Sequence, residues 1–216
     1  MIEDNLRKDL LSEKPIENVF QKHVIDGSSY FFNKAINKPD LEYDFRYELA
    51  NLLKINLHDI IIVGSAKIGF SLKDHAFNKF DHVYNTSRNP NEKSDIDVAV
   101  VSNNIFEEIS RNIYEISKHF NPEWATENWK TNNFNSMPKN LLKSYTFYVA
   151  KGWLRPDLMP LIYYSSAPWV AFIERWRKEL GRKISIGIYS NWYYLKHYQM
   201  DNLTDLRVKL LELKIQ

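Results

Sequence analysis

Cysteine is absent from this chain of 216 residues, which excludes disulfides, thiolate zinc sites and a cysteine nucleophile. Long apolar runs are absent too, because the longest, such as DIIIVG and DVAVV, are far shorter than a membrane span. The amino-terminal stretch MIEDNLRKDLLSEK is charged throughout and has no apolar segment typical of a signal peptide. We therefore expect a cytoplasmic protein that has no membrane partner.

Charge of one sign is also scarce. The formal net charge is only +2, so any basic surface for nucleic acid would have to be local. Apolar residues make up 44% of the chain, which is ordinary for a globular protein. No internal repeat or low-complexity tract divides the sequence, and its length suits a single domain over residues 1–216.

Hydrophobic periodicity predicts the elements. Short apolar runs at residues 60–63, 95–101 and 183–189 predict three strands. Helical spacing of apolar residues predicts helices within residues 15–37, 39–53, 103–120, 139–152, 168–181 and 202–214. Residues 73–93 and 121–137 have no clear period, which predicts irregular structure. The fold class is therefore α/β (α+β): a small mixed β-sheet flanked by helices, with a core at about 40–120 plus the strand near 183–189, and a helical, aromatic annex at about 121–180.

The stretch NEKSDIDVAVV places two aspartates, Asp95 and Asp97, at the start of a strand that otherwise reads as buried. Since side chains alternate between the faces of a strand, both carboxylates fall on one face, opposite the apolar face of Ile96 and Val98. Adjacent carboxylates repel each other, and Mg²⁺ relieves the repulsion and takes phosphate and water as further ligands. The alternative is an exposed strand end, where both residues face water.

The stretch IIIVGSAKIGF places Gly64 and Ser65 where the first strand turns into a short helix. Glycine lets the backbone approach a ligand closely, and the free N–H groups of a helix start suit a phosphate. Lys67 lies in the first turn and could reach the same anion. The alternative is an ordinary helix cap at a tight turn. Together, the turn and the aspartate pair supply the two halves of a site for a nucleoside triphosphate.

The segment VGSAKIGFSL followed by SDIDVAVV resembles the signature of the nucleotidyltransferase superfamily typified by DNA polymerase beta, over roughly residues 60–101. The resemblance implies that Gly64 and Ser65 hold the triphosphate and that Asp95 and Asp97 are catalytic ligands of Mg²⁺ or Mn²⁺. It also implies two-metal catalysis, in which an acceptor hydroxyl attacks the α-phosphate in line and pyrophosphate leaves.

The resemblance leaves the acceptor open between a protein side chain, an RNA end and a small molecule. By analogy, small prokaryotic members of the superfamily often act in toxin–antitoxin or phage-defence settings, which leaves room for a partner protein.

The sequence departs from the family pattern in two ways. The first is a long segment between the two motifs, residues 73–93. It carries four cationic residues, Lys73, Lys79, Arg88 and Lys93. These cations either cover a triphosphate or an acceptor, or they belong to a solvated surface insertion. The family also places a third carboxylate on a later strand, whereas KISIGIY offers Ser185 or Gly187 on the matching face. Asp157, in GWLRPDLMP, is either the source of that third metal ligand or a surface residue in a local ion pair.

The second half of the chain is rich in aromatic residues. One helical stripe is expected to be core: Trp169, Phe172, Ile173, Trp176 and Leu180. Four tyrosines follow no clear pattern: Tyr163, Tyr164, Tyr193 and Tyr194. They either pack with their polar tips outward or form a base-stacking surface with cations nearby in the sequence. Those cations are Arg155, Arg175, Arg177, Arg182 and Lys183.

Three functions follow from these patterns. A Mg²⁺-dependent nucleotidyltransferase that uses a nucleoside triphosphate accounts for both motifs. A catalytically impaired, nucleotide-binding or regulatory partner module accounts for the absence of a third acid on KISIGIY. An Asp-x-Asp glycosyltransferase would use Asp95 and Asp97 to hold a nucleotide-sugar diphosphate instead.

Overall fold

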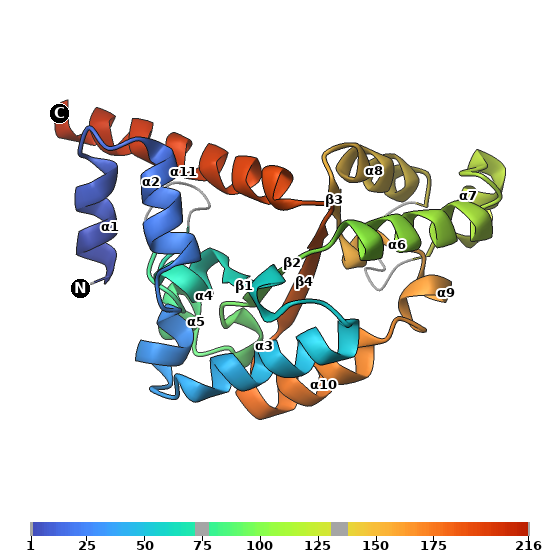
Figure 1. The fold of residues 1–216 in the computed structure, drawn as a ribbon, viewed down its shortest axis with the longest axis horizontal. Helices are drawn as coiled ribbons and strands as arrows, with labels where there is room; N and C mark the ends of the chain where they lie inside the picture. The colour runs from blue at the N-terminus through green and yellow to red at the C-terminus, as the bar shows by residue number, and fades with distance from the viewer. Residues whose placement is uncertain (1, 72–77, 131–137, 216) are drawn as a thin grey trace.

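The computed structural model describes residues 2–71, 78–130 and 138–215 and shows a four-stranded mixed sheet surrounded by helices (Figure 1). The strands are β1 (Ile60–Val63), β2 (Ile96–Val101), β3 (Trp153–Leu154) and β4 (Ile184–Tyr189), in the order β1-β2-β4-β3. β1 and β2 are antiparallel, β2 and β4 are parallel, and β3 pairs antiparallel with β4. The prediction of a small mixed sheet flanked by helices is therefore confirmed. β3 escaped prediction because a strand of two residues has no readable alternation.

One face of the sheet packs on the larger hydrophobic core. Ile96, Val98 and Val100 point into it, as the alternation of β2 predicted. The helices α3 (Asp40–Leu53), α6 (Asn103–Ile116) and α10 (Trp169–Leu180) supply the opposing side chains. Phe45 of α3 meets Trp176 of α10 edge to face, with ring centroids 5.3 Å apart. The aromatic stripe of α10 is thus core, as expected, with Leu180 partly buried at its end.

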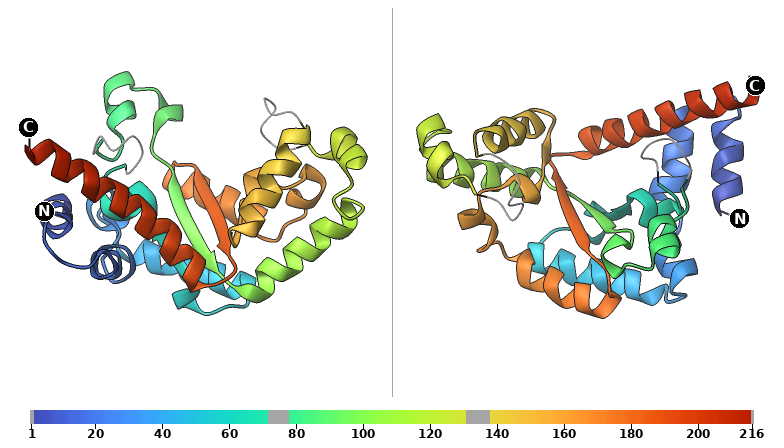
Figure 2. Two further views of the ribbon diagram at one scale, coloured as in Figure 1. Left: turned by 90° about the horizontal axis from the view of Figure 1, so that it is seen from above. Right: turned by 180° about the vertical axis from the view of Figure 1, so that it is seen from behind.

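The other face of the sheet packs on a second core at the carboxyl end of β2. Ala99 and Val101 lie here against Leu195 and Leu203 of α11 (Trp192–Ile215), with α1 (Ile2–Leu10) and α2 (Ile16–Phe20) beyond. Figure 2 shows α11 running across this side of the sheet toward α1 and α2. Because this second core includes only the later part of β2, Asp97 near the start of the strand stays half-buried.

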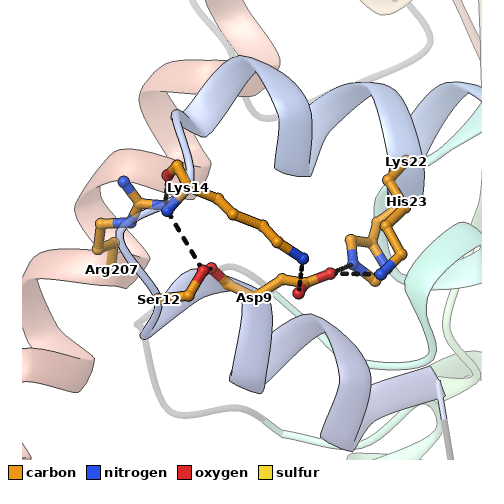
Figure 3. Close-up of polar contacts among 6 residues, drawn as sticks. All are labelled: Asp9, Ser12, Lys14, Lys22, His23 and Arg207. Carbon is orange, nitrogen blue, oxygen red and sulfur yellow. Dashed lines mark hydrogen bonds and ion pairs between the residues drawn. The ribbon is translucent and has the colours of Figure 1, made fainter.

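Polar contacts fasten the amino-terminal helices to each other and to α11 (Figure 3). Asp9 is buried and accepts from Lys14 Nζ at 2.6 Å, Lys22 Nζ at 2.6 Å and His23 Nε2 at 2.9 Å. These contacts, led by that with Lys14, lower the pKa of Asp9 well below its usual range, against the opposing effect of burial. Arg207 of α11 donates to the carbonyls of Leu10 and Lys14 at 2.8 and 2.7 Å.

The remaining elements refine the predicted boundaries. The segment 15–37 is helical in pieces, because α2 is continued by a π-helical turn at Gln21–Ile25 and followed after a break by another at Phe31–Ala35. The annex holds α7 (Pro122–Asn128), α8 (Pro138–Ala150) and α9 (Leu161–Tyr164). No helix of the described ranges is both long and apolar enough to cross a membrane.

Two stretches expected to be irregular contain helices. α5 (His82–Ser87) lies within 73–93, and α7 lies within 121–137. α7 is short, so it shows no period, but its start carries local signals: Asn121 accepts from the Trp124 N–H at 2.9 Å, and Pro122 holds the first helical position. α11 begins at Trp192, ten residues before the predicted start at 202, because its tyrosine-rich first turns show no apolar stripe.

Candidate functional site

The structure brings the Gly-Ser turn against Asp97, the second member of the aspartate pair. In the antiparallel register of β1 and β2, Val63 lies opposite Asp97, so the next residue, Gly64, falls beside the Asp97 side chain. Gly64 has a φ of +64°, and a Cβ built on it would come 2.8 Å from Asp97 Oδ2. Both the backbone conformation and the close approach require glycine here. The two motifs, thirty residues apart in the sequence, therefore share one small region of space.

Asp97 lies in β2 on the face opposite Ile96 and Val98, as the alternation predicted, and Asp95 immediately precedes the strand. The Asp95 side chain is 34% exposed, and its carboxylate lies 3.0 Å from the Lys183 ammonium. Asp97 is half-buried, and its negative charge helps to raise the pKa of Tyr189, whose own burial is the larger cause. Both residues are thus partly accessible to solvent, and a cation already lies beside Asp95.

β4 runs alongside the aspartates and presents no acid to them. Ser185 lies opposite Asp97, and Gly187 lies opposite Ala99, as expected from alternation along KISIGIY. Asp157 lies instead in the turn Pro156–Leu158, where Arg155 donates to it at 3.1 and 2.8 Å. Over the residues that the structure describes, no group of three or more His, Asp or Glu side chains is arranged to hold a metal ion. The local ion pair foreseen as the alternative for Asp157 is therefore present.

Ser65 and Lys67 of α4 (Gly64–Ile68) differ in their access to the site. Ser65 is half-buried and directly follows Gly64. Lys67 is only 4% exposed, and its ammonium donates to the carbonyl of Gly27. Burial lowers the pKa of Lys67, and the neighbouring Glu42 carboxylate opposes that shift. Because the Lys67 ammonium is held inside the protein, its placement differs from the expected contact with an anion at the turn.

The start of β2 is anchored by a nearly buried ion pair. Arg182, just before β4, reaches Asp81 at 2.6 and 2.5 Å and the carbonyl of Ser94 at 3.2 Å. Asp81 and Ser94 also exchange hydrogen bonds between side chain and backbone, each 2.9 Å long. Burial alone would raise the pKa of Asp81, but Arg182 and the Ser94 amide offset it, and the net pKa is lowered. This cluster fixes the strand end that carries the aspartates.

The cations of the segment 73–93 have separate positions. Lys93 lies 5.4 Å from the centre of the Tyr84 ring, and its ammonium is 3.5 Å from the Gly181 carbonyl. Lys79 and Arg88 are exposed. Lys73 lies outside the described residues.

An aromatic cluster adjoins the aspartate face on the β4 side, and sequence reasoning did not identify it. Trp153 of β3 stacks on Tyr189 with centroids 5.5 Å apart and 6° between the rings, and Tyr198 of α11 packs against both. A Cβ built on Gly187 would come 2.6 Å from Trp153 Nε1, so glycine makes room for the indole. Arg155 lies over the Trp153 ring at 5.4 Å. The only sequence signal for this cluster was the abundance of aromatic residues.

The tyrosines singled out from the sequence pack largely against the two cores: Tyr163 and Tyr164 lie partly buried on the larger core, and Tyr194 lies partly buried on the second core. Arg175 pairs with Glu48, and Arg177 pairs with Glu174 at 2.7 Å. Tyr193 is 64% exposed on α11 and packs against His197 with the rings tilted at 49° and their centroids 4.2 Å apart. Of the two alternatives for these tyrosines, packing with polar tips outward agrees with the partial burial of Tyr163, Tyr164 and Tyr194.

Comparisons of this chain with protein-family models, with curated proteins and with solved structures found no match. The site must be interpreted from its own geometry.

Proposed function

We propose that the protein is a metal-dependent nucleotidyltransferase that moves a nucleoside monophosphate from a triphosphate to an acceptor hydroxyl. The observation that carries this proposal is the contact between Gly64 and Asp97. It joins a backbone turn of the kind that accommodates phosphate to a carboxylate pair of the kind that holds a divalent ion. The order of elements also agrees with the resemblance: a strand, a Gly-Ser helix start and then a neighbouring strand with Asp-x-Asp.

The donor set fits Mg²⁺ or Mn²⁺, since both prefer carboxylate oxygens, and Asp95 and Asp97 would hold the ion. When bound, such an ion neutralises charge on the phosphates and lowers the pKa of an attacking hydroxyl. The backbone at Gly64 and Ser65 would orient the triphosphate beside the aspartates. The acceptor oxygen then bonds to the α-phosphorus, the bond to the bridging oxygen breaks, pyrophosphate leaves and the hydroxyl proton is released.

Lys183 has a further part in this proposal. Its ammonium lies 3.0 Å from Asp95 and offsets the repulsion between the two carboxylates. Because the Lys183 side chain is 62% exposed, it can leave Asp95 when a divalent ion takes its place. The ammonium would then be free to contact the polyphosphate chain.

A second candidate is a nucleotide-binding module without transfer activity. It is favoured by Ser185, which lies opposite Asp97 where the family would place its third carboxylate. In this case metal and triphosphate bind, and the nucleotide state governs a partner protein. A glycosyltransferase that holds a nucleotide sugar through the same pair is the weaker alternative.

The test is incubation of the purified protein with each α-labelled nucleoside triphosphate, Mg²⁺ or Mn²⁺ and cell extract. Transfer of label to protein, RNA or a small molecule, lost in Asp95→Asn and Asp97→Asn, supports the proposal. The exposed carboxylate Asp44 provides the matched control, because Asp44→Asn should transfer label at the wild-type rate. Metal-dependent binding without transfer supports the nucleotide-binding module. Turnover of a nucleotide sugar, with no use of a triphosphate, contradicts both.

A further inference from the structure

Four aromatic side chains follow one another across α8, β3 and α11. β3 lies between α8 and the start of α11, so residues far apart in the sequence meet here (Figure 1). Trp153 is at the centre, because Tyr148 meets its ring edge to face at 5.0 Å and Tyr198 packs against it at 4.7 Å. Phe147 extends the row, with its ring centre 5.5 Å from that of Tyr148. We call Phe147, Tyr148, Trp153 and Tyr198 the aromatic strip.

The two ends of the aromatic strip are open to solvent. Phe147 is 54% exposed and Tyr198 is 40% exposed, while Tyr148 and Trp153 between them are half-buried. Aromatic rings that reach solvent in succession offer surfaces on which unpaired bases can stack.

Two cations lie on the rings of the strip. The Lys151 ammonium is 4.3 Å from the centre of the Phe147 ring, and Lys151 is exposed. The Arg155 guanidinium is 4.8 Å from the centre of the Tyr148 ring. Arg155 also pairs with Asp157, but that carboxylate is 57% exposed, and an exposed pair contributes little. A cation beside a stacking ring suits the phosphate that follows a stacked base.

The inner end of the strip adjoins the aspartate site. Tyr198 packs against Tyr189 of β4, with ring centroids 6.4 Å apart. Tyr189 shares a face of the sheet with Asp97, because it alternates with Ser185, which lies opposite Asp97 in the register. Burial raises the pKa of Tyr198, and the negative charge of Asp97 adds to that shift. A strand on the strip would therefore lead toward the aspartates.

We propose that the aromatic strip binds a single-stranded nucleic acid and directs its 3′ end to the aspartate pair. The bases stack on the exposed rings, and the phosphates contact Lys151 and Arg155. Repeated rings with cations beside them match the repeated bases and phosphates of a strand, which neither a protein nor a small-molecule acceptor provides. Binding depends on the strip alone, whereas the role of the strand as acceptor rests on the proposed function.

In that role the terminal 3′-hydroxyl is the acceptor. Its oxygen bonds to the α-phosphorus of the nucleoside triphosphate, and the bond from that phosphorus to the bridging oxygen breaks. Pyrophosphate leaves, and the hydroxyl proton passes to solvent. The strand grows by one nucleotide.

The first experiment measures binding of fluorescently labelled single-stranded RNA and DNA of about ten nucleotides by anisotropy, without triphosphate or divalent metal. The tighter of the two identifies the natural strand, and a duplex of the same sequence binds roughly tenfold more weakly because its bases are already paired. Phe147→Ala and Tyr198→Ala each weaken binding by about five- to hundredfold. Lys151→Gln reduces the slope of log affinity against log salt by about 0.7.

Matched controls come from other faces of the molecule. Tyr43→Ala removes an aromatic ring on α3 that is 56% exposed, and Lys178→Gln removes an exposed cation on α10. Both variants should bind the single strand as the wild type does. If Tyr198→Ala unfolds in less urea than the wild type, Phe147→Ala decides the outcome, because Phe147 is the most exposed ring of the strip.

The second experiment follows transfer of label from an α-labelled nucleoside triphosphate to the same oligonucleotide in the presence of Mg²⁺. Phe147→Ala should raise the KM for the oligonucleotide and leave the KM for the triphosphate unchanged. A loss of folding alone would not separate the two constants.

The outcomes separate this inference from the proposed function. Absence of single-strand binding, equal affinity for the duplex, or binding unchanged in Phe147→Ala overturns the assignment of the strip. Transfer of label to a protein or a small molecule but not to the oligonucleotide overturns the acceptor and leaves the proposed function standing. Binding that depends on the strip, without transfer to any acceptor, supports the strip and contradicts the proposed function.

Discussion

Gly64→Ala is the substitution that tests the contact between the turn and the aspartate pair. Gly64 has a φ of +64°, and the added methyl group would come 2.8 Å from Asp97 Oδ2. Alanine in the left-handed region costs about 1–2 kcal/mol. Relieving the clash by moving the Asp97 carboxylate or the turn costs about 1–3 kcal/mol more.

Gly181→Ala provides the matched control for this experiment. Gly181 has a φ of +59°, and no atom lies within 4 Å of a Cβ built there, so this variant carries the conformational cost alone. The difference between the two variants in free energy of unfolding should therefore be about 1–3 kcal/mol. For a chain of this size, each kcal/mol corresponds to about 2–4 °C in Tm.

The assay is urea unfolding of both variants, and of Gly64→Ala combined with Asp97→Ala. Removing the Asp97 carboxylate removes the nearest atom, so the extra cost of Gly64→Ala should disappear in the double variant. Equal destabilisation by Gly64→Ala and Gly181→Ala, or an extra cost that persists without Asp97, would refute the reasoning.

Further predictions concern β4, the anchor of β2 and the amino-terminal helices. Ser185→Asp places a carboxylate opposite Asp97 and should raise the initial rate of label transfer by about tenfold. An unchanged rate would argue that the lack of a third acid on β4 does not limit activity. Arg182→Ala removes the guanidinium that pairs with the nearly buried Asp81 and should lower the free energy of unfolding, measured with denaturant, by about 3–5 kcal/mol. Arg177→Ala, which removes an exposed pair, should lower it by about 0–1 kcal/mol. The pKa of Asp9 is lowered in the folded protein, so its carboxylate stabilises the fold above its unfolded pKa of about 4, and this contribution is lost progressively as the pH falls below that value. Asp9→Asn should therefore flatten the decline of the free energy of unfolding in acid. An unchanged slope of the free energy of unfolding against pH would contradict this.

The sheet was largely predictable because three of its strands carry a local sequence signal. Ile60–Val63, Ile96–Val101 and Ile184–Tyr189 are short apolar runs next to turn residues, and each is a strand. Gly64 was likewise readable as a turn, since its neighbours are β-branched on one side and helix-forming on the other. What the sequence could not supply was the register of β1 against β2, which sets Val63 opposite Asp97 and so creates the site.

Contacts between distant segments explain what sequence reasoning missed. Lys67 reads as a free cation near a turn, yet it is buried because the chain around Gly27 packs over α4 and offers a carbonyl. Trp153 and Tyr189 belong to strands that pair only in the folded sheet, so no spacing in the sequence reveals their stacking.

Metal-dependent binding of a nucleoside triphosphate tests most directly whether the Gly-Ser turn and the aspartate pair form one site. The measurement is equilibrium titration with a non-hydrolysable triphosphate, with and without Mg²⁺, for the wild type and Asp97→Asn. Binding that requires Mg²⁺ and is lost in Asp97→Asn is the predicted result. Binding that does not depend on the metal, or that persists in Asp97→Asn, would contradict the account.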